Sequence, residues 1–295
     1  MKKILLLGRN GQVGQELVPQ LQPLGDLVSL GRDQLNLSQP EQVRTALQTL
    51  QPSVIVNAAA YTAVDKAESE PELAQAINGT APMVLAQTAA AIGAQLIHIS
   101  TDYVFDGQHH RPYREDHATA PLGAYGRSKQ QGEQGICESA AQAIILRTAW
   151  VYGAKGHGNF VKTMLRVGAE REEIRVVDDQ IGTPTWSHDI AQAICGLIQT
   201  TPLESQPGTE IYHFTNSGAA SWYDFAVAIF EEAEQLGYPL KLRRLMPITT
   251  EEYPLPAPRP SYSVLCNQKI RQRLSTPAQH WRPALRKMLG ELLQR

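Results

Sequence analysis

The chain lacks the features that mark disulfide-stabilised, membrane-spanning and nucleic-acid-binding proteins. Its three cysteines are scattered and odd in number, which indicates reduced thiols in a cytoplasmic protein, not a disulfide framework or a zinc site. No run of about 18 apolar residues occurs, so no segment is expected to span a membrane. The net charge of −2 gives no reason to expect nucleic acid as a partner. The eight histidines form no cluster with metal-ligand spacing.

Short apolar runs alternate with helical patterns through the first half of the chain. Strands are expected at 4–7, 27–30, 54–57, 96–100 and 143–147. Helices are expected at 12–24, 40–50, 71–93 and 125–139. Ser38 is the expected N-cap of the second helix. This alternation predicts an α/β protein with a Rossmann-type, doubly wound parallel sheet.

The pattern changes after about residue 150, where loops lengthen and prolines gather between 239 and 260. Helices are expected there at 160–167, 187–199, 222–236 and 283–293. We therefore expect a nucleotide-binding domain at 1–150 and a smaller mixed lobe at 151–295. Strands expected at 174–177 and 211–213 are candidates for the main sheet.

Three glycines stand between the first expected strand and the first expected helix. The segment from Gly8 to Gly14 reads Gly-x-x-Gly-x-x-Gly, with Gly11 at its centre. Glycines permit a tight turn and a close approach of the backbone to a pyrophosphate, and the following helix N-terminus attracts that anion. In this context we interpret the segment as a dinucleotide-binding site.

The end of the second expected strand bears on the choice between NADPH and NADH. An acidic residue at the strand tip would bind the ribose 2′-hydroxyl of NADH, but Gly31 and Arg32 occupy it and Asp33 follows. Arg32, or Arg9 in the glycine segment, can pair with the 2′-phosphate of NADPH. We therefore expect NADPH as the preferred cofactor. NADH stays a second possibility, because the Asp33 carboxylate could bind its ribose 2′-hydroxyl.

Tyr125 and Lys129 are four residues apart within an expected helix, so their side chains lie on one face. A free phenol has a pKa of about 10, and a fixed ammonium beside it lowers that pKa by favouring the phenolate. The pair is a candidate proton donor to a carbonyl, although the same spacing is common on exposed helices.

A hydroxyl group is expected near this pair. Ser100 and Thr101 follow a strand at the sheet edge where open α/β proteins bind ligands. Hydroxyl, phenol and ammonium around one oxygen suit carbonyl reduction: hydride reaches the carbon, Tyr125 protonates the oxygen, and Thr101 stabilises its charge. Lys129 would also hold the nicotinamide ribose.

These motifs together resemble the extended short-chain dehydrogenases/reductases and, among them, the dTDP-4-dehydrorhamnose reductase family. The matching segments extend over almost the whole chain, at 8–14, 57–60, 62–68, 100–105, 125–129, 147–152, 159–160, 179–185 and 259–260. The resemblance implies NAD(P)H-dependent reduction of the 4-keto group of dTDP-4-dehydro-L-rhamnose to dTDP-L-rhamnose, the last step of dTDP-rhamnose biosynthesis. It also implies that the C-terminal lobe binds the sugar nucleotide.

Motifs and resemblance together give a set of expected site residues. Cofactor binding is expected of Gly8, Gly11, Gln12, Val13, Gly14, Arg32, Asn36, Leu37, Ala60, Tyr61, Thr62, Tyr125 and Lys129. Substrate binding is expected of Thr101, Asp102, Trp150 and Arg259, the last because a guanidinium suits a diphosphate. Catalysis is expected of Tyr125, Lys129 and Thr101. Trp222 and Trp281 are expected to pack in the core.

Other functions stay open beside this one. A dehydratase is disfavoured, because such enzymes place Asp-Glu after the Thr, and here Tyr103 follows Asp102. A reductase or epimerase of another nucleotide sugar and a non-catalytic regulatory subunit of the same fold are the remaining alternatives.

A metal site is not predicted, and the oligomeric state stays open between monomer and homodimer. Some members of the family bind Mg²⁺ at a dimer interface through acidic residues, and Glu16 matches one such position. His188 stands where a glutamate would be expected, with Asp189 beside it as a substitute. Because Mg²⁺ prefers several carboxylate oxygens, its binding here is uncertain.

Overall fold

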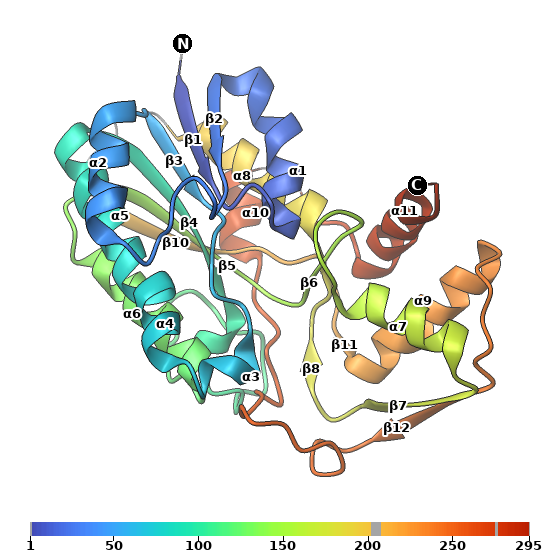
Figure 1. Cartoon of the computed structure of the whole chain (residues 1–295). Coiled ribbons are helices and arrows are strands. Elements are labelled where there is room, and N and C mark those ends of the chain that lie inside the picture. Colours follow the sequence, from blue (N-terminus) through green and yellow to red (C-terminus); the bar gives the residue numbers. More distant parts are fainter. Residues whose placement is uncertain (1, 202–207, 275–276, 295) are drawn as a thin grey trace.

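The computed structural model describes residues 2–201, 208–274 and 277–294 (Figure 1). Within these residues, six parallel strands form the central sheet in the order β10-β5-β4-β3-β1-β2. Their bounds are β1 (Lys3–Leu7), β2 (Asp26–Leu30), β3 (Val54–Asn57), β4 (Gln95–Thr101), β5 (Gln142–Thr148) and β10 (Gly208–His213). The first strand lies inside the sheet and the chain winds away from it on both sides, so the predicted doubly wound sheet is confirmed.

Helices cover both faces of this sheet. One face carries α1 (Gln12–Leu21), α8 (Ser187–Thr200) and α10 (Gln268–Leu274). The other face carries α2 (Pro40–Leu50), α5 (Ala81–Ile92) and α6 (Ala124–Cys137). All four residues of β3 are buried as a result, which explains why residues 54–56 are a continuous apolar run without alternation.

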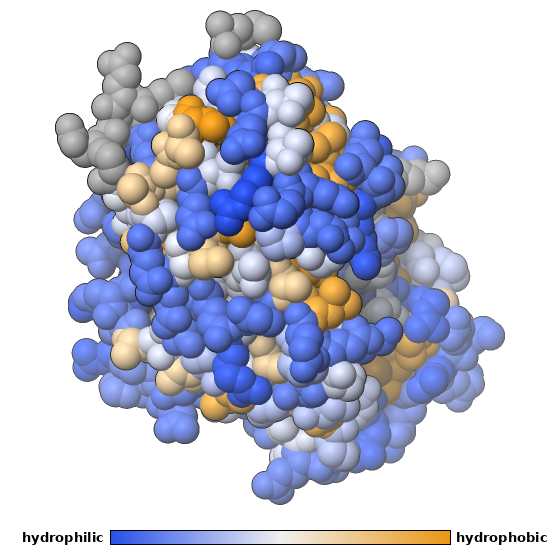
Figure 2. Space-filling model, turned by 60° about the vertical axis from the view of Figure 1, so that its left-hand side comes forward, coloured by the Kyte–Doolittle hydropathy of each residue, from blue (hydrophilic) through white to orange (hydrophobic). Residues whose placement is uncertain are grey.

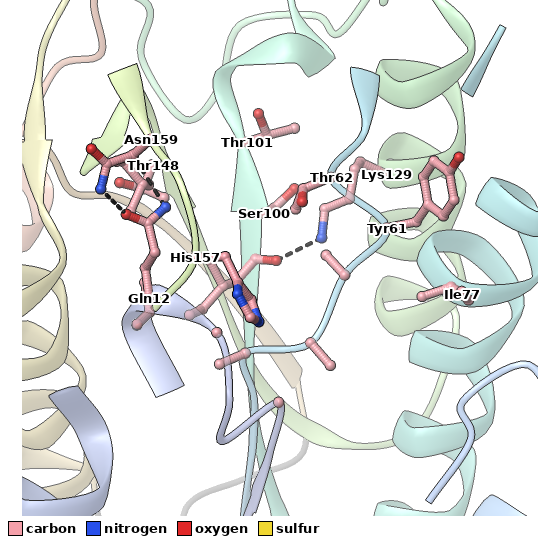
Figure 3. A pocket seen from close by; sticks show the side chains of 18 of the residues that line it. Gln12, Tyr61, Thr62, Ile77, Ser100, Thr101, Lys129, Thr148, His157 and Asn159 are labelled. Carbon is pink, nitrogen blue, oxygen red and sulfur yellow. Dashed lines mark hydrogen bonds between the residues drawn. The ribbon is translucent and has the colours of Figure 1, made fainter. Parts of the chain in front are cut away.

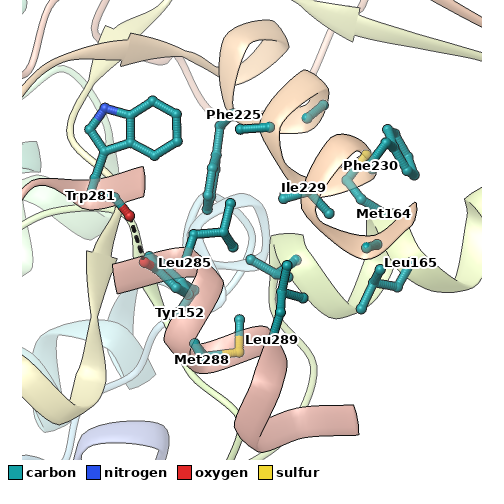
Figure 4. Close-up of a cluster of buried hydrophobic side chains, with 14 of the residues drawn as sticks. Tyr152, Met164, Leu165, Phe225, Ile229, Phe230, Trp281, Leu285, Met288 and Leu289 are labelled. Carbon is teal, nitrogen blue, oxygen red and sulfur yellow. Dashed lines mark hydrogen bonds between the residues drawn. The ribbon is translucent and has the colours of Figure 1, made fainter. Parts of the chain in front are cut away.

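A second lobe packs beyond the carboxyl ends of the central strands. Its helices are α7 (Phe160–Glu170), α9 (Trp222–Gln235) and α11 (Trp281–Leu293). They enclose a core of their own around Phe225, Ile229, Leu285 and Met288, on which Tyr152 also packs (Figure 4). This core is separate from the two cores that flank the sheet.

Short strand pairs complete the second lobe. They are β6 (Val151–Tyr152) with β9 (Thr185–Trp186), β8 (Ile181–Gly182) with β11 (Ala220–Ser221), and β7 (Glu173–Val177) with β12 (Arg244–Ile248). The expectation for the strand at 174–177 is corrected, because β7 pairs with β12 and not with the main sheet. The strand expected at 211–213 does extend that sheet as β10.

Three details of the expected helices differ in the structure. The helix expected at 71–93 is divided into α4 (Pro71–Gln75), a π-helical turn (Ala76–Thr80) and α5. The one expected at 12–24 becomes a 3₁₀ turn at Gln22–Leu24, where Pro23 stops the α-helix. Ser38 is not the cap of α2, because its N–H and hydroxyl donate to Asn36 Oδ1 instead.

Polar side chains cover most of the face drawn in Figure 2, with apolar ones scattered among them. Among the described residues, the exposed large apolar ones are Leu122, Leu236, Tyr253 and Leu255. Among the helices that the structure describes, none is long and apolar enough to cross a membrane.

Candidate active site

A cavity of about 750 Å³ lies at the carboxyl ends of the central strands, where they face the second lobe (Figure 3). Its lining includes most of the expected site residues, namely Gly8, Gly11, Gln12, Val13, Arg32, Asn36, Leu37, Ala60, Tyr61, Thr62, Thr101, Asp102, Tyr125, Lys129 and Trp150. Gly14, Glu16 and Arg259 do not line it. The chain thus brings cofactor, catalytic and substrate candidates to one site.

The glycine segment connects β1 to α1 at the wall of the cavity. Gly8 has a φ of +86°, and a Cβ there would lie 2.7 Å from the backbone nitrogen of Ala59. Gly14 packs under the loop, since its Cβ would lie 2.0 Å from the Gly8 carbonyl oxygen. A Cβ on Gly11 would approach nothing within 4 Å except that oxygen, at 3.4 Å. Gly11 therefore leaves the amides at the start of α1 open to an anion such as a pyrophosphate.

Arg32 and Arg9 differ in their surroundings. Arg9 lies 4.0 Å from the Asp33 carboxylate and donates to the Ser29 carbonyl. Arg32 is exposed at the rim of the cavity, and within the described residues it has no ion pair or hydrogen bond. Its guanidinium is therefore free to meet a phosphate, whereas Arg9 is partly engaged.

Asn78 connects the cofactor-side loop to the helix that carries the catalytic candidates. It lies in the π-helical turn and is buried. Its Oδ1 accepts from the Tyr61 N–H over 2.8 Å, and its Nδ2 donates to the Tyr61 carbonyl and to Ser128 Oγ. The Ser128 hydroxyl donates in turn to the Tyr125 carbonyl. Sequence reasoning missed Asn78, although a π-helical turn often marks a functional site.

Tyr125 is held in the wall of the cavity at the start of α6. Its ring packs edge-on against Tyr103, with centroids 5.5 Å apart. Burial raises the pKa of the phenol to about 12, the Thr101 hydroxyl beside it lowers that pKa, and the Asp102 charge raises it. The expected lowering of this pKa by Lys129 is thus wrong for the structure, because desolvation of the phenolate dominates.

Lys129 is buried in the same wall and points to the backbone of β4. Its ammonium nitrogen donates to the Ile99 carbonyl over 2.7 Å and lies 3.2 Å from His98 Nε2. Burial lowers the pKa of Lys129 to about 8, against the charge of Glu133, which raises it. Among the described residues it has no carboxylate within ion-pair distance, so a ligand in the cavity can become its main partner.

Thr101 and Asp102 form a hydrogen-bonded pair where β4 ends. Thr101 Oγ1 donates to Asp102 Oδ1 over 3.0 Å and accepts from the Tyr103 N–H over 3.2 Å. A hydroxyl has one proton, so Thr101 can donate to a ligand only when it leaves Asp102. Burial raises the pKa of Asp102 to about 6, although hydrogen bonds with Ser263 and Thr101 lower it.

Two further hydroxyl groups line the cavity without partners. Ser100 Oγ and Thr148 Oγ1 are buried and, within the described residues, have no hydrogen bond. Buried polar atoms in proteins are nearly always satisfied, so these two indicate a polar ligand. With the glycine segment and Arg32, they make the cavity a fitting site for a nicotinamide dinucleotide.

Two tryptophans form the wall on the side of the second lobe. Trp150 and Trp222 stack with ring centroids 3.6 Å apart and planes 4° apart. Trp150 has a left-handed φ of +46°, and Gly182 leaves room for its indole, since a Cβ at 182 would lie 2.4 Å from that ring. Trp222 was expected only to pack, but it also lines the cavity. His157, Phe160 and Phe225 are lining residues that sequence reasoning did not select.

Arg259 does not reach the cavity as expected. Its Nη2 donates to Asp65 Oδ2 over 2.8 Å and its Nη1 donates to the Ala257 carbonyl. The guanidinium is thus engaged by a carboxylate of the first domain, and a substrate contact of Arg259 stays a prediction.

Glu16 lies behind the glycine segment, on the buried side of α1. Its Oε2 is 2.9 Å from Lys155 Nζ and 3.5 Å from His188 Nδ1. Asp189 does not approach Glu16 as a substitute ligand, because its Oδ2 accepts from Asn216 and Gln279. Within the described residues no group of three or more metal-ligating side chains occurs.

Comparison with known proteins agrees with this arrangement. The family model described as RmlD substrate binding domain matches residues 1–294. The chain is 44% identical to the dTDP-4-dehydrorhamnose reductase of Escherichia coli K12, over 98% of this chain and 97% of that protein. It is 43% identical to the enzyme of the same name from Burkholderia thailandensis, over 99% of both chains.

Solved structures show the same relationship. The structure of dTDP-4-dehydrorhamnose reductase from Bacillus anthracis in complex with NADP matches with a TM-score of 0.90 and 38% identity, over 98% of this chain and 99% of that one. The UDP-glucose 4-epimerase of Thermus thermophilus, solved with NAD, shares the fold at 18% identity and a TM-score of 0.80, over 99% of both chains. The chain therefore belongs to the dTDP-4-dehydrorhamnose reductase family of oxidoreductases.

Proposed function

We propose that the protein reduces the 4-keto group of dTDP-4-dehydro-L-rhamnose with NADPH and releases dTDP-L-rhamnose, the last step of dTDP-rhamnose biosynthesis. The observation that carries the proposal is the single cavity that brings together the glycine segment, Thr101, Tyr125, Lys129 and Trp150. The names of the relatives in Escherichia coli and Burkholderia thailandensis support the choice of substrate.

In this reaction bound NADPH supplies a hydride to the carbonyl carbon. The phenol of Tyr125 donates its proton to the carbonyl oxygen, so the product gains one hydrogen at carbon and one at oxygen. Thr101 turns its proton from Asp102 to the same oxygen and stabilises the charge that develops there. The ammonium of Lys129 binds the nicotinamide ribose and supports the phenolate that remains on Tyr125.

The proposal includes a preference for NADPH over NADH. Arg32 supports it, because an unpaired guanidinium at the cavity rim suits a 2′-phosphate. Whether Mg²⁺ binds, and whether the protein is a monomer or a homodimer, stay open questions. A location in the cytoplasm and a domain boundary near residue 150 stay predictions.

An alternative substrate, with a different sugar, also has support. A relative from Streptomyces antibioticus, 41% identical over 98% of this chain, is named a probable 4-ketoreductase of a different compound, a dTDP-4,6-dihydroxy-2-methyloxan-3-one. Another 4-keto sugar nucleotide is therefore the second candidate substrate. A non-catalytic role is disfavoured, because phenol, ammonium and hydroxyl all line the cavity.

The test is turnover of NADPH with the dTDP-4-keto sugar by the wild-type protein and by Tyr125→Phe. Loss of the proton donor should lower kcat by about 100- to 10,000-fold, with NADPH binding retained. Tyr253→Phe is the matched control, since Tyr253 is exposed and outside the cavity. A wild-type protein without turnover would refute the proposed reaction, and an active Tyr125→Phe would refute the assigned donor.

A further inference from the structure

A buried chain of polar groups runs under the floor of the cavity, from β3 through β4 to α6. Asn57 ends β3 and His98 lies opposite it on β4. Asn57 Nδ2 is 3.0 Å from His98 Nδ1, and His98 Nε2 is 3.2 Å from Lys129 Nζ. All three side chains are at most 1% exposed, so solvent does not screen or replace these contacts.

The direction of each hydrogen bond in this chain can be assigned from one fixed donor. The backbone N–H of Ala59 can only donate, and it lies 3.2 Å from Asn57 Oδ1. The Asn57 amide is thereby oriented with its Nδ2 toward His98, where it donates to Nδ1. A neutral imidazole that accepts at Nδ1 carries its proton on Nε2. Burial keeps the pKa of His98 well below its usual value, so the ring is neutral.

Nε2–H of His98 consequently faces Lys129. An N–H cannot accept a hydrogen bond from an ammonium, but it can donate to the lone pair of a neutral amine. Lys129 as an amine satisfies every contact: it accepts from His98 and donates to the Ile99 carbonyl over 2.7 Å. As an ammonium it would leave two donors facing each other in a buried site.

Other charged groups around Lys129 do not reverse this preference. Glu133, on the same helix, raises the pKa of Lys129, but Arg147 pairs with that carboxylate at 2.6 Å. Tyr125 is protonated at neutral pH, and Asp102 lies on the far side of Thr101. The pKa of Lys129 is lowered to about 8 as a net result, with burial as its main cause.

We propose that His98, held in one tautomer by Asn57, favours Lys129 as a neutral amine in the free protein, so that NADPH binding in mildly alkaline solution takes up a proton at Lys129. The inference rests on the proposed cofactor site, in which ribose oxygens replace His98 as the partners of Lys129. The proton comes from solvent and no covalent bond changes. His98 is a positioning residue, since it acts through Lys129.

Proton uptake can be measured by calorimetric titration of NADPH into the protein at pH 8.5, in buffers of different ionisation enthalpy. At this pH the phosphates of NADPH are already ionised. We expect uptake of about 0.8 proton per site, which is the neutral fraction of an amine with a pKa of about 8. The affinity for NADPH should fall as the pH rises from 8 to 9.5.

Two variants should reduce the uptake by different means. The amide of His98→Gln can present its oxygen to an ammonium. The carboxylate of Asn57→Asp cannot donate to Nδ1, so it moves the imidazole proton there and leaves Nε2 as an acceptor. Both should bind NADPH with less proton uptake than the wild-type protein, because more of Lys129 is then charged beforehand.

His213→Gln is the control variant. His213 is equally buried, but it contacts Arg147 and Tyr113 instead of Lys129, so this variant should keep the wild-type uptake.

The possible results separate the inference from the cofactor site on which it rests. Binding of NADPH by the wild-type protein without proton uptake would overturn the role of His98, even if both variants fail to fold. Unchanged uptake in His98→Gln would do the same. Absence of NADPH binding would refute the cofactor site itself, and the inference with it.

Discussion

Trp150 and Trp222 stack face to face across the two lobes, with ring centroids 3.6 Å apart. Trp150 follows the central strand β5, whereas Trp222 begins α9 in the second lobe. The two side chains are 72 residues apart in sequence, and each lines the cavity. The wall on the sugar side therefore depends on how the lobes are packed together.

Replacement of Trp222 should affect the sugar nucleotide more than the cofactor. We expect Trp222→Leu to raise the KM for the dTDP-sugar by roughly two- to tenfold, in line with the 0.5–1.5 kcal/mol of an aromatic pair, and to leave NADPH binding unchanged. Steady-state kinetics with each substrate varied would measure this. Trp281→Phe is the control: it should lower the melting temperature without a change in either KM, because Trp281 is in the lobe core and not in the cavity.

Arg32→Ala should raise the KM for NADPH by tenfold or more and leave that for NADH nearly unchanged. The reason is that a charge-assisted hydrogen bond to a 2′-phosphate contributes about 1.5–3 kcal/mol, and NADH lacks this phosphate. Arg9→Ala should have a smaller effect, since Arg9 is paired with Asp33. Equal changes for both cofactors in Arg32→Ala would contradict the assignment.

Asp102→Asn should stabilise the fold at neutral pH, while it weakens binding of the substrate. Burial raises the pKa of Asp102 from 3.8 to about 6, so the folded state binds the proton more tightly than the unfolded state. Its contribution to stability is complete below pH 3.8 and is lost as the pH rises through about 6. The shift corresponds to roughly 3 kcal/mol. Melting curves should show the wild type losing stability relative to Asp102→Asn between pH 4 and 6, and parallel curves would refute this.

Removal of divalent metal should leave the molecular mass in solution unchanged. Lys155 and His188 of the same chain already contact the Glu16 carboxylate, at 2.9 and 3.5 Å, and Asp189 is engaged with Asn216. A cation would have to displace an ammonium to bind there. Sedimentation equilibrium with and without EDTA measures this directly, and a lower mass in EDTA would show that a metal bridges two copies.

Local sequence patterns predicted the elements that build the cofactor side of the cavity. The inner strands β1, β3, β4 and β5 are largely buried, so their apolar runs could be recognised in the sequence. The glycine segment was recognisable from its position between β1 and α1. The spacing of Tyr125 and Lys129 put them on one helix face. It could not give the pKa of Tyr125, because that depends on burial by segments distant in sequence.

The remaining site residues depend on contacts that sequence spacing does not contain. Asn78 meets Tyr61 and Ser128 only after two helices and a loop have packed. Arg259 finds Asp65, which lies 194 residues earlier in the chain, and so does not enter the cavity. For Trp222, the sequence does not distinguish an aromatic residue that packs in a core from one that lines a binding site. The distinction requires the position of the other walls of the cavity.

The path of the chain limits how the second lobe can be exchanged with that of a relative. After residue 150 the chain returns to the first domain, where α8 covers the sheet and β10 forms its edge. A chimera joined once at residue 150 would therefore import a foreign edge strand and a foreign covering helix along with the new lobe. Recombination for a new sugar specificity would instead need several junctions, placed so that β10 and α8 stay with the sheet on which they pack.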